Sequence, residues 1–177
     1  MIKIVTGQKN AGKTTYLKHK IKELEPCDGF LSMKAFDEDN FLGYELYHLG
    51  SGERQRFIVN DDNLCESSGD KRLGDFLFLG EGIAFGKTVL RRALKASVNV
   101  VIDEIAQMEL MNDVFYEEVK VAIQLQQSSV VKDAKDDEAW DLYLVVRKAL
   151  IGEVVEKFDI QAYQLIQIEG GEAINET

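Results

Sequence analysis

The sequence predicts an α/β fold with a mostly parallel central sheet and an antiparallel β-hairpin insert. Three observations support this prediction. Short apolar runs alternate with helix-length segments near both ends of the chain, which is typical of a parallel sheet covered by helices. Two segments of alternating apolar residues flank a polar turn, which indicates a hairpin. A glycine-containing loop joins the first strand to the first helix.

The first strand and helix lie close to the start of the chain. Ile2–Thr6 is a short apolar run and predicts a buried strand. Lys13–Leu24 carries apolar residues at helical spacing, and Pro26, the only proline, ends that helix.

The hairpin insert is expected at about residues 29–59. Its two main strands are Gly29–Phe36 and Asn40–Leu49, which flank the turn Asp37–Asn40. Arg54–Val59 predicts a third antiparallel strand.

Strands and helices alternate again in the rest of the chain. We expect, in order, an edge strand at Phe76–Leu79, a helix at Ile83–Ser97, a strand at Asn99–Ile102, a helix at Met111–Gln127, a strand at Leu142–Val146, a helix at Lys148–Phe158 and a strand at Tyr163–Ile168. The polar stretches 60–72 and 128–141 predict surface loops, and the tail 170–177 is expected to fray.

Composition excludes several classes of protein. With 177 residues the chain fits one domain, residues 1–177, with a sizeable core. A net charge of −10 argues against a nucleic-acid partner, which requires a basic face. No apolar run reaches the length of a membrane span. The two cysteines, Cys27 and Cys65, show no metal-ligand spacing, so we expect reduced thiols and a cytoplasmic location.

The stretch GQKNAGKTT follows the first strand and fits the phosphate-loop pattern G-x-x-x-x-G-K-[ST] in full. Glycines let the backbone curve around a phosphate, and the following helix directs its N-terminal dipole at the anion. Lys13 is expected to reach the β- and γ-phosphates, and the Thr14 hydroxyl to bind Mg²⁺. The predicted nucleotide-binding residues are Gly7, Gln8, Lys9, Asn10, Ala11, Gly12, Lys13, Thr14 and Thr15.

A second ending of the same kind, Gly86-Lys87-Thr88, lies inside an expected helix. Position 81 is Glu rather than the first glycine of the pattern. We therefore interpret this stretch as structural.

A phosphate loop requires an acid at the end of a neighbouring strand to hold the magnesium shell. Asp103 stands where the apolar run Asn99–Ile102 ends, and Glu104 follows it. Asp103 is the expected magnesium residue. A carboxylate at Glu104 can orient and deprotonate a water in line with the γ-phosphate.

The stretch VIDEIAQMEL, residues 101–110, resembles the second motif of the small P-loop nucleoside-triphosphatases of bacteria and archaea, whose human member is called cancer-related nucleoside-triphosphatase. The matching residues are Asp103, Glu104, Ile105, Met108, Glu109 and Leu110. The pairs Gly29-Phe30 and Gly43-Tyr44 look like that family's hairpin. The resemblance implies a RecA-like three-layer fold and Mg²⁺-dependent hydrolysis of ATP, GTP and other nucleoside triphosphates.

Two departures from the family pattern stand out. Ala106-Gln107 replaces the family's Gly-Lys, so no lysine is available there to neutralise charge near the γ-phosphate. The Asn-Arg pair expected near the last strand is missing. Arg147 follows a strand and is a candidate cation, although an arginine so placed is more often solvated or ion-paired.

Three functions follow from these patterns. The first is a Mg²⁺-dependent nucleoside-triphosphatase that releases diphosphate and phosphate. The second is a nucleotide-binding switch with little turnover, which the change at Gln107 keeps open. The third is a nucleotide or nucleoside kinase, although the only arginine cluster, Arg91-Arg92, lies inside an expected helix rather than in a lid.

Overall fold

The computed structural model describes residues 1–60, 67–96, 98–131 and 140–176. Ten strands occur in this part of the chain: β1 (Ile2–Thr6), β2 (Cys27–Asp37), β3 (Asn40–His48), β4 (Arg54–Val59), β5 (Lys71–Leu73), β6 (Phe76–Phe78), β7 (Asn99–Ile105), β8 (Leu142–Val146), β9 (Gln164–Glu169) and β10 (Glu172–Glu176). The helices are α1 (Lys13–Lys20), α2 (Gly80–Ala93), α3 (Gln107–Leu110), α4 (Tyr116–Val131) and α5 (Ile151–Lys157), with 3-10 turns η1 (Ile21–Glu23) and η3 (Lys148–Leu150).

All these strands form one mixed sheet in the order β10-β9-β1-β8-β7-β2-β3-β4-β6-β5. The centre is parallel: β1 pairs with β8 and β9, and β7 pairs with β8 and the start of β2. From β2 to β5 the pairing is antiparallel. The predicted α/β class with a mostly parallel centre is confirmed.

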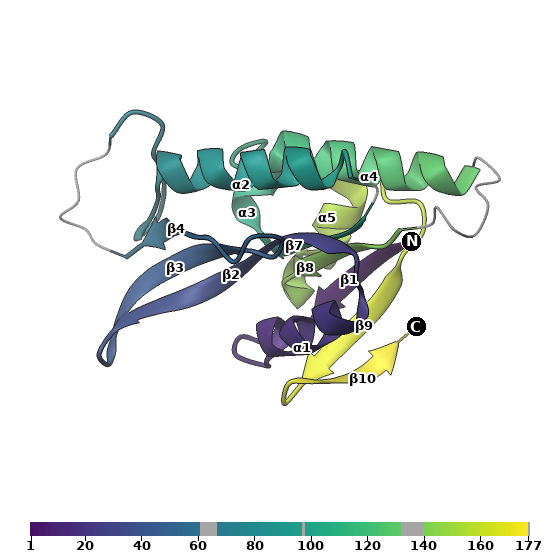
Figure 1. Cartoon of the computed structure of the whole chain (residues 1–177), viewed down its shortest axis with the longest axis horizontal. Coiled ribbons are helices and arrows are strands. Elements are labelled where there is room, and N and C mark those ends of the chain that lie inside the picture. The colour runs from purple at the N-terminus through teal and green to yellow at the C-terminus, as the bar shows by residue number, and fades with distance from the viewer. Residues whose placement is uncertain (61–66, 97, 132–139, 177) are drawn as a thin grey trace.

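Helices cover both faces of the sheet. Figure 1 shows α2, α4 and α5 on one side and α1 on the other. The larger core cluster lies under α2 and α4, where Leu90 and Ile123 pack with Ile102 and Leu144 of the central strands. A smaller cluster under α1 includes Leu17. Burial of these apolar faces is the main stabilising contribution to such a layered fold.

The hairpin insert forms as expected. β2 and β3 pair in antiparallel fashion and turn at Glu38, which has a left-handed φ of 51°. The two strands reach well beyond the helical layers (Figure 1). β4 then returns along β3 as the third strand of the insert.

Two expectations on the outer strands are wrong. Lys71–Leu73, expected in a loop, forms β5, which pairs with β6. β6 is therefore not at the edge of the sheet, and its Leu77 is buried. Only part of this expected loop can be assessed, because positions 61–66 and Cys65 with them lie outside the described residues.

The region after β7 also differs from the expectation. A single helix from Met111 was expected, but the short helix α3 ends at Leu110 and α4 begins at Tyr116. Asn112 and Val114 between them have positive φ values of 63° and 51°, which a helix cannot contain. α4 also continues to Val131, into the expected loop 128–141, of which positions 132–139 are not described.

The tail does not fray. Glu172–Glu176 forms β10, which pairs with β9 in antiparallel fashion after a turn at Gly170 and Gly171. Pairing with β9 supplies the backbone hydrogen bonds that a short polar segment lacks by itself.

Among the described residues, no helix combines the length and the apolar character needed to cross a membrane. Cys27 is a free thiol, and burial raises its pKa to about 12, so it stays protonated and unreactive at neutral pH.

The closest approach between β2 and β7 requires a glycine at position 29. Gly29 has a φ of +116°, and a Cβ there would collide with the carbonyl oxygen of Val101. We expect Gly29→Ala to lower the free energy of unfolding by at least about 2 kcal/mol in a denaturant titration.

The control is Gly152→Ala in α5, where an added Cβ meets nothing within 4 Å. This variant should match or exceed the wild-type stability by up to about 1 kcal/mol, because alanine favours a helix. Equal effects of the two substitutions would contradict the strand contact.

Candidate functional site

Two positions of the loop between β1 and α1 require glycine, one for its backbone conformation and one for a close contact. Gly12, the residue before α1, has a left-handed φ of +89°. A Cβ on Gly7 would lie 2.6 Å from the carbonyl oxygen of Ile168 in β9. The loop therefore leads tightly from the strand into the helix, with backbone N–H groups left at the start of α1 for an anion.

The turn between β9 and β10 packs against this loop. The Gly171 N–H donates to the Ala11 carbonyl oxygen at 2.8 Å. A Cβ on Gly12 would lie 2.5 Å from the Gly171 Cα. The C-terminal hairpin, which the sequence predicted as a frayed tail, thus supports the predicted phosphate loop.

Lys13 is held by the same loop. Its Nζ donates to the carbonyl oxygens of Gly7 at 3.2 Å and Gln8 at 2.9 Å. Burial lowers the Lys13 pKa, against the opposing charges of Asp103 and Glu104, while Arg147 lowers it further. Two acids and two cations therefore lie close enough to act on one another electrostatically.

Thr14 at the start of α1 contacts Asp103 of β7. The Thr14 hydroxyl donates to Asp103 Oδ2 at 3.2 Å, and the backbone N–H of Ser32 donates to the same oxygen at 3.1 Å. Asp103 is 5% exposed, and burial, aided by the charge of Glu104, raises its pKa to about 7. β7 continues to Ile105, so Asp103 lies inside this strand rather than at its end.

These groups fit a magnesium ion. A hydroxyl and a carboxylate are the hard oxygen donors that Mg²⁺ takes, usually with few protein ligands, several waters and substrate phosphates. Within the described ranges, no three His, Cys, Asp or Glu side chains gather into a metal site. A cation here would also offset the burial of the Asp103 carboxylate.

Glu104 stands in a strained part of β7. Its φ is +72°, a left-handed value that costs a non-glycine residue about 1–2 kcal/mol. The register of β7 against β8 shifts between Ile102 and Ile105. Such a bulge re-aims a side chain, and here Glu104 Oε1 accepts a 2.8 Å hydrogen bond from Arg147 Nη2.

The hairpin insert adds two residues near the site. Lys34 Nζ of β2, which no motif indicated, donates to Asn10 Oδ1 of the loop at 2.9 Å. Burial raises the pKa of Tyr44 in β3, with a further rise from the charge of Glu104. Tyr44 belongs to the Gly43-Tyr44 pair of the hairpin, whereas the only sequence signal for Lys34 was the position of the insert, since β2 pairs with β7 and so starts beside the second motif.

Glu109 stabilises the turn between α3 and α4. Its carboxylate accepts hydrogen bonds from the N–H groups of Ala106 at 3.0 Å and Phe115 at 3.4 Å, which caps α3 and ties it to the start of α4. Glu109 is thus a capping acid at the start of α3. Gln107, which stands where the resemblance places a lysine, is exposed at the start of α3.

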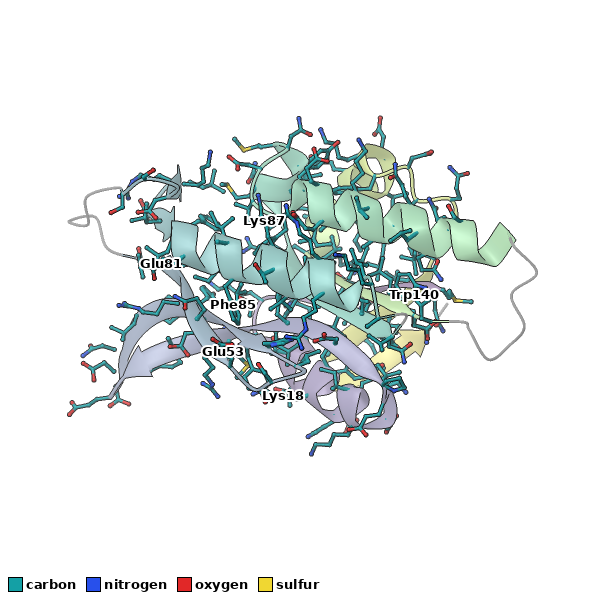
Figure 2. The ribbon with its side chains drawn as sticks, turned by 45° about the horizontal axis from the view of Figure 1, so that its top comes forward. Lys18, Glu53, Glu81, Phe85, Lys87 and Trp140 are labelled. Atoms are coloured by element: carbon teal, nitrogen blue, oxygen red, sulfur yellow. The ribbon has the colours of Figure 1, made fainter. Side chains whose placement is uncertain are left out.

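Two other stretches lie away from the loop. Lys87 belongs to α2 in the outer helical layer (Figure 2), and Thr88 donates to the Ala84 carbonyl within that helix, as a structural interpretation predicts. Trp140 is partly buried against the larger core cluster, at the other end of the molecule from the hairpin tip (Figure 2). It is therefore a residue at the edge of the core.

Comparison with known proteins gives one family. Residues 3–162 match the sequence profile of a family described as NTPase. A nucleoside-triphosphatase called THEP1, from Methanocaldococcus jannaschii, is 26% identical over 166 residues, covering 86% of this chain and 94% of that protein.

Two solved structures share the fold. The crystal structure of THEP1 from Aquifex aeolicus matches with a TM-score of 0.64 and 19% identity, over 96% of this chain and 90% of the other. The solution structure of a human cancer-related nucleoside triphosphatase matches with a TM-score of 0.55 and 22% identity, over 94% and 86%. Both likenesses support a P-loop α/β fold.

The buried Glu109 carboxyl should make stability depend on pH. Burial raises its pKa from 4.5 to about 7, so the folded state holds the proton more tightly than the unfolded state does. Its contribution is fully present below about pH 4.5 and is lost as the pH rises through about 7. We expect the difference in unfolding free energy between wild type and Glu109→Gln to fall by about 1–3 kcal/mol from pH 5.5 to pH 8.

Glu117→Gln, at an exposed position in the first turn of α4, is the control. Its difference from the wild type should be the same at both pH values. If Glu109→Gln behaves like this control in urea titrations, Glu109 does not titrate in this range.

Proposed function

Because the chain belongs to this NTPase family, we propose that it is a Mg²⁺-dependent nucleoside-triphosphate phosphohydrolase that converts ATP, GTP and other nucleoside triphosphates to diphosphate and phosphate. One observation carries the proposal. The Thr14 hydroxyl, at the start of α1, donates a 3.2 Å hydrogen bond to Asp103 Oδ2 of β7. This contact joins the phosphate loop to the strand that bears Glu104.

The loop and the start of α1 would bind the phosphates of the nucleoside triphosphate. The backbone N–H groups of residues 7–15 would face the phosphates, and Lys13 would exchange its bonds to the Gly7 and Gln8 carbonyls for the β- and γ-phosphate oxygens. Thr14 and Asp103 would hold Mg²⁺, which when bound neutralises charge on the phosphate oxygens.

Hydrolysis would use Glu104 as the base. The oxygen of a water held by its carboxylate attacks the γ-phosphorus, the bond from that phosphorus to the β–γ bridging oxygen breaks, and the water's proton passes to Glu104. The electron pair stays on the diphosphate. Strain at Glu104 supports this role, because left-handed backbone at a bulky residue is often retained at active sites.

A nucleotide-binding switch with little turnover is the second candidate. An ion pair with Arg147 engages Glu104, and Gln107 supplies no cation. Both features would slow hydrolysis without weakening the loop. The single-domain organisation, the cytoplasmic location and the absence of a nucleic-acid partner stay predictions.

Phosphate release from ATP and GTP with Mg²⁺ tests the proposal. Wild type should release phosphate. Lys13→Ala should lose nucleotide affinity by about 10-fold or more, because a charge-assisted contact to phosphate is removed. Glu104→Gln should bind nucleotide but turn over about 100-fold more slowly, the usual contribution of a general base.

Lys87→Ala is the matched control, since Lys87 stands in the second GKT ending but lies on α2. It should keep both affinity and turnover. Tight binding by the wild type without any phosphate release would overturn the hydrolase and favour the switch. Transfer of phosphate to an added nucleoside or nucleotide would favour a kinase.

A further inference from the structure

We propose that Arg147 is a γ-phosphate sensor: it leaves the ion pair with Glu104 that the structure shows and moves to the γ-phosphate when a triphosphate binds, which frees Glu104 to hold the attacking water. This inference rests on the proposed function. It adds a residue and a control step that the two sequence motifs do not contain.

The position of Arg147 follows from the sheet. It comes directly after β8, and β8 lies between β1, which leads into the loop, and β7, which carries Asp103 and Glu104. The three strands are parallel, so their carboxyl ends share one edge. Arg147 therefore stands between the loop and the predicted base.

Contacts and charges agree with this placement. Arg147 Nη2 donates to Glu104 Oε1 at 2.8 Å, and the charge of Arg147 also acts on Lys13 and on Tyr44. Lys13 is the residue expected at the β- and γ-phosphates. Arg147 therefore stands on the same side of the site as the expected γ-phosphate.

The pair is suited to exchange. The Arg147 side chain is 65% exposed and Glu104 is 28% exposed, and ion pairs this open to solvent hold weakly. The bond to Glu104 uses one of the five N–H donors of the guanidinium. A γ-phosphate carries more charge than one carboxylate and can accept two parallel N–H bonds, so it is the stronger partner.

A diphosphate cannot cause this exchange, because it lacks the γ-phosphate. After release of the phosphate, Arg147 would return to Glu104. The base would then be free only while a triphosphate is bound. Charge on the γ-phosphate would then be neutralised from the end of β8, a part that Gln107 cannot play because it carries no charge.

Two other described cationic side chains, Lys34 and Arg54, are weaker candidates for the sensor. Lys34 bonds to the side chain of Asn10 on the outside of the loop, and Arg54 pairs with Glu45 on the hairpin. Neither contacts Glu104. Only Arg147, among the residues that the structure describes, joins a cation to the predicted base in an ion pair.

Binding of AMPPNP and of ADP, each with Mg²⁺, tests the sensor by calorimetry on the full chain. Arg147→Ala should weaken AMPPNP binding by about 10-fold or more and leave ADP binding within about 2-fold of wild type, because only AMPPNP carries the γ-phosphate. Turnover of ATP should fall by about 100-fold or more, since an arginine on the transferred phosphoryl group contributes strongly to kcat. Arg147→Lys should recover part of the AMPPNP affinity.

Arg54→Ala is the control, because Arg54 is also an exposed, ion-paired arginine but its ion pair lies on the hairpin. This variant should change neither affinity nor turnover. Retained ADP binding shows that each variant is folded. If Arg147→Ala lowers turnover but leaves the ratio of AMPPNP to ADP affinity unchanged, Arg147 only positions Glu104 and the sensor is overturned. If the wild type binds neither nucleotide, the proposed function itself fails.

Discussion

Parallel pairing on both sides of β8 is the constraint on which the site depends. β8 bonds to β1 on one side and to β7 on the other, so three strands from distant parts of the chain end at one edge. Thr14 and Asp103, 89 positions apart, thereby come within hydrogen-bonding distance. Glu104, the predicted base, and its partner Arg147 come from the same edge. Apolar packing on both faces holds these strands in register, so the core places Asp103, Glu104 and Arg147 beside the loop that holds Lys13.

The carboxyl groups of Asp103 and Glu109 are both buried, and burial raises the pKa of each to about 7. The two groups differ in their hydrogen-bond partners. Glu109 accepts hydrogen bonds from two backbone N–H groups of the turn it caps. Asp103 accepts a hydrogen bond from the Thr14 hydroxyl beside the predicted phosphate loop, and the charge of Glu104 acts on it. The same rise in pKa therefore accompanies a capping role at Glu109 and the proposed ion-binding role at Asp103.

Local patterns predicted much of this structure. The apolar runs located β1, β7 and β8, and the turn at Asp37–Asn40 located the hairpin, because periodicity records which side chains are buried. β10 was missed because Glu172–Glu176 is a short, mostly polar segment that forms a strand only by pairing with β9. Lys34 and the left-handed backbone of Glu104 were missed for the same reason: both depend on tertiary contacts that no local spacing encodes.

The left-handed backbone at Glu104 sets stability against activity at one position. Glycine would relax this φ, and so would asparagine to a lesser degree, yet neither carries a carboxylate. A lineage selected for folding alone would accumulate such replacements here early, whereas selection for turnover would oppose them. Relatives that have become pure nucleotide binders should then be recognisable by a small or amide residue at this point of the bulge, with the phosphate loop unchanged.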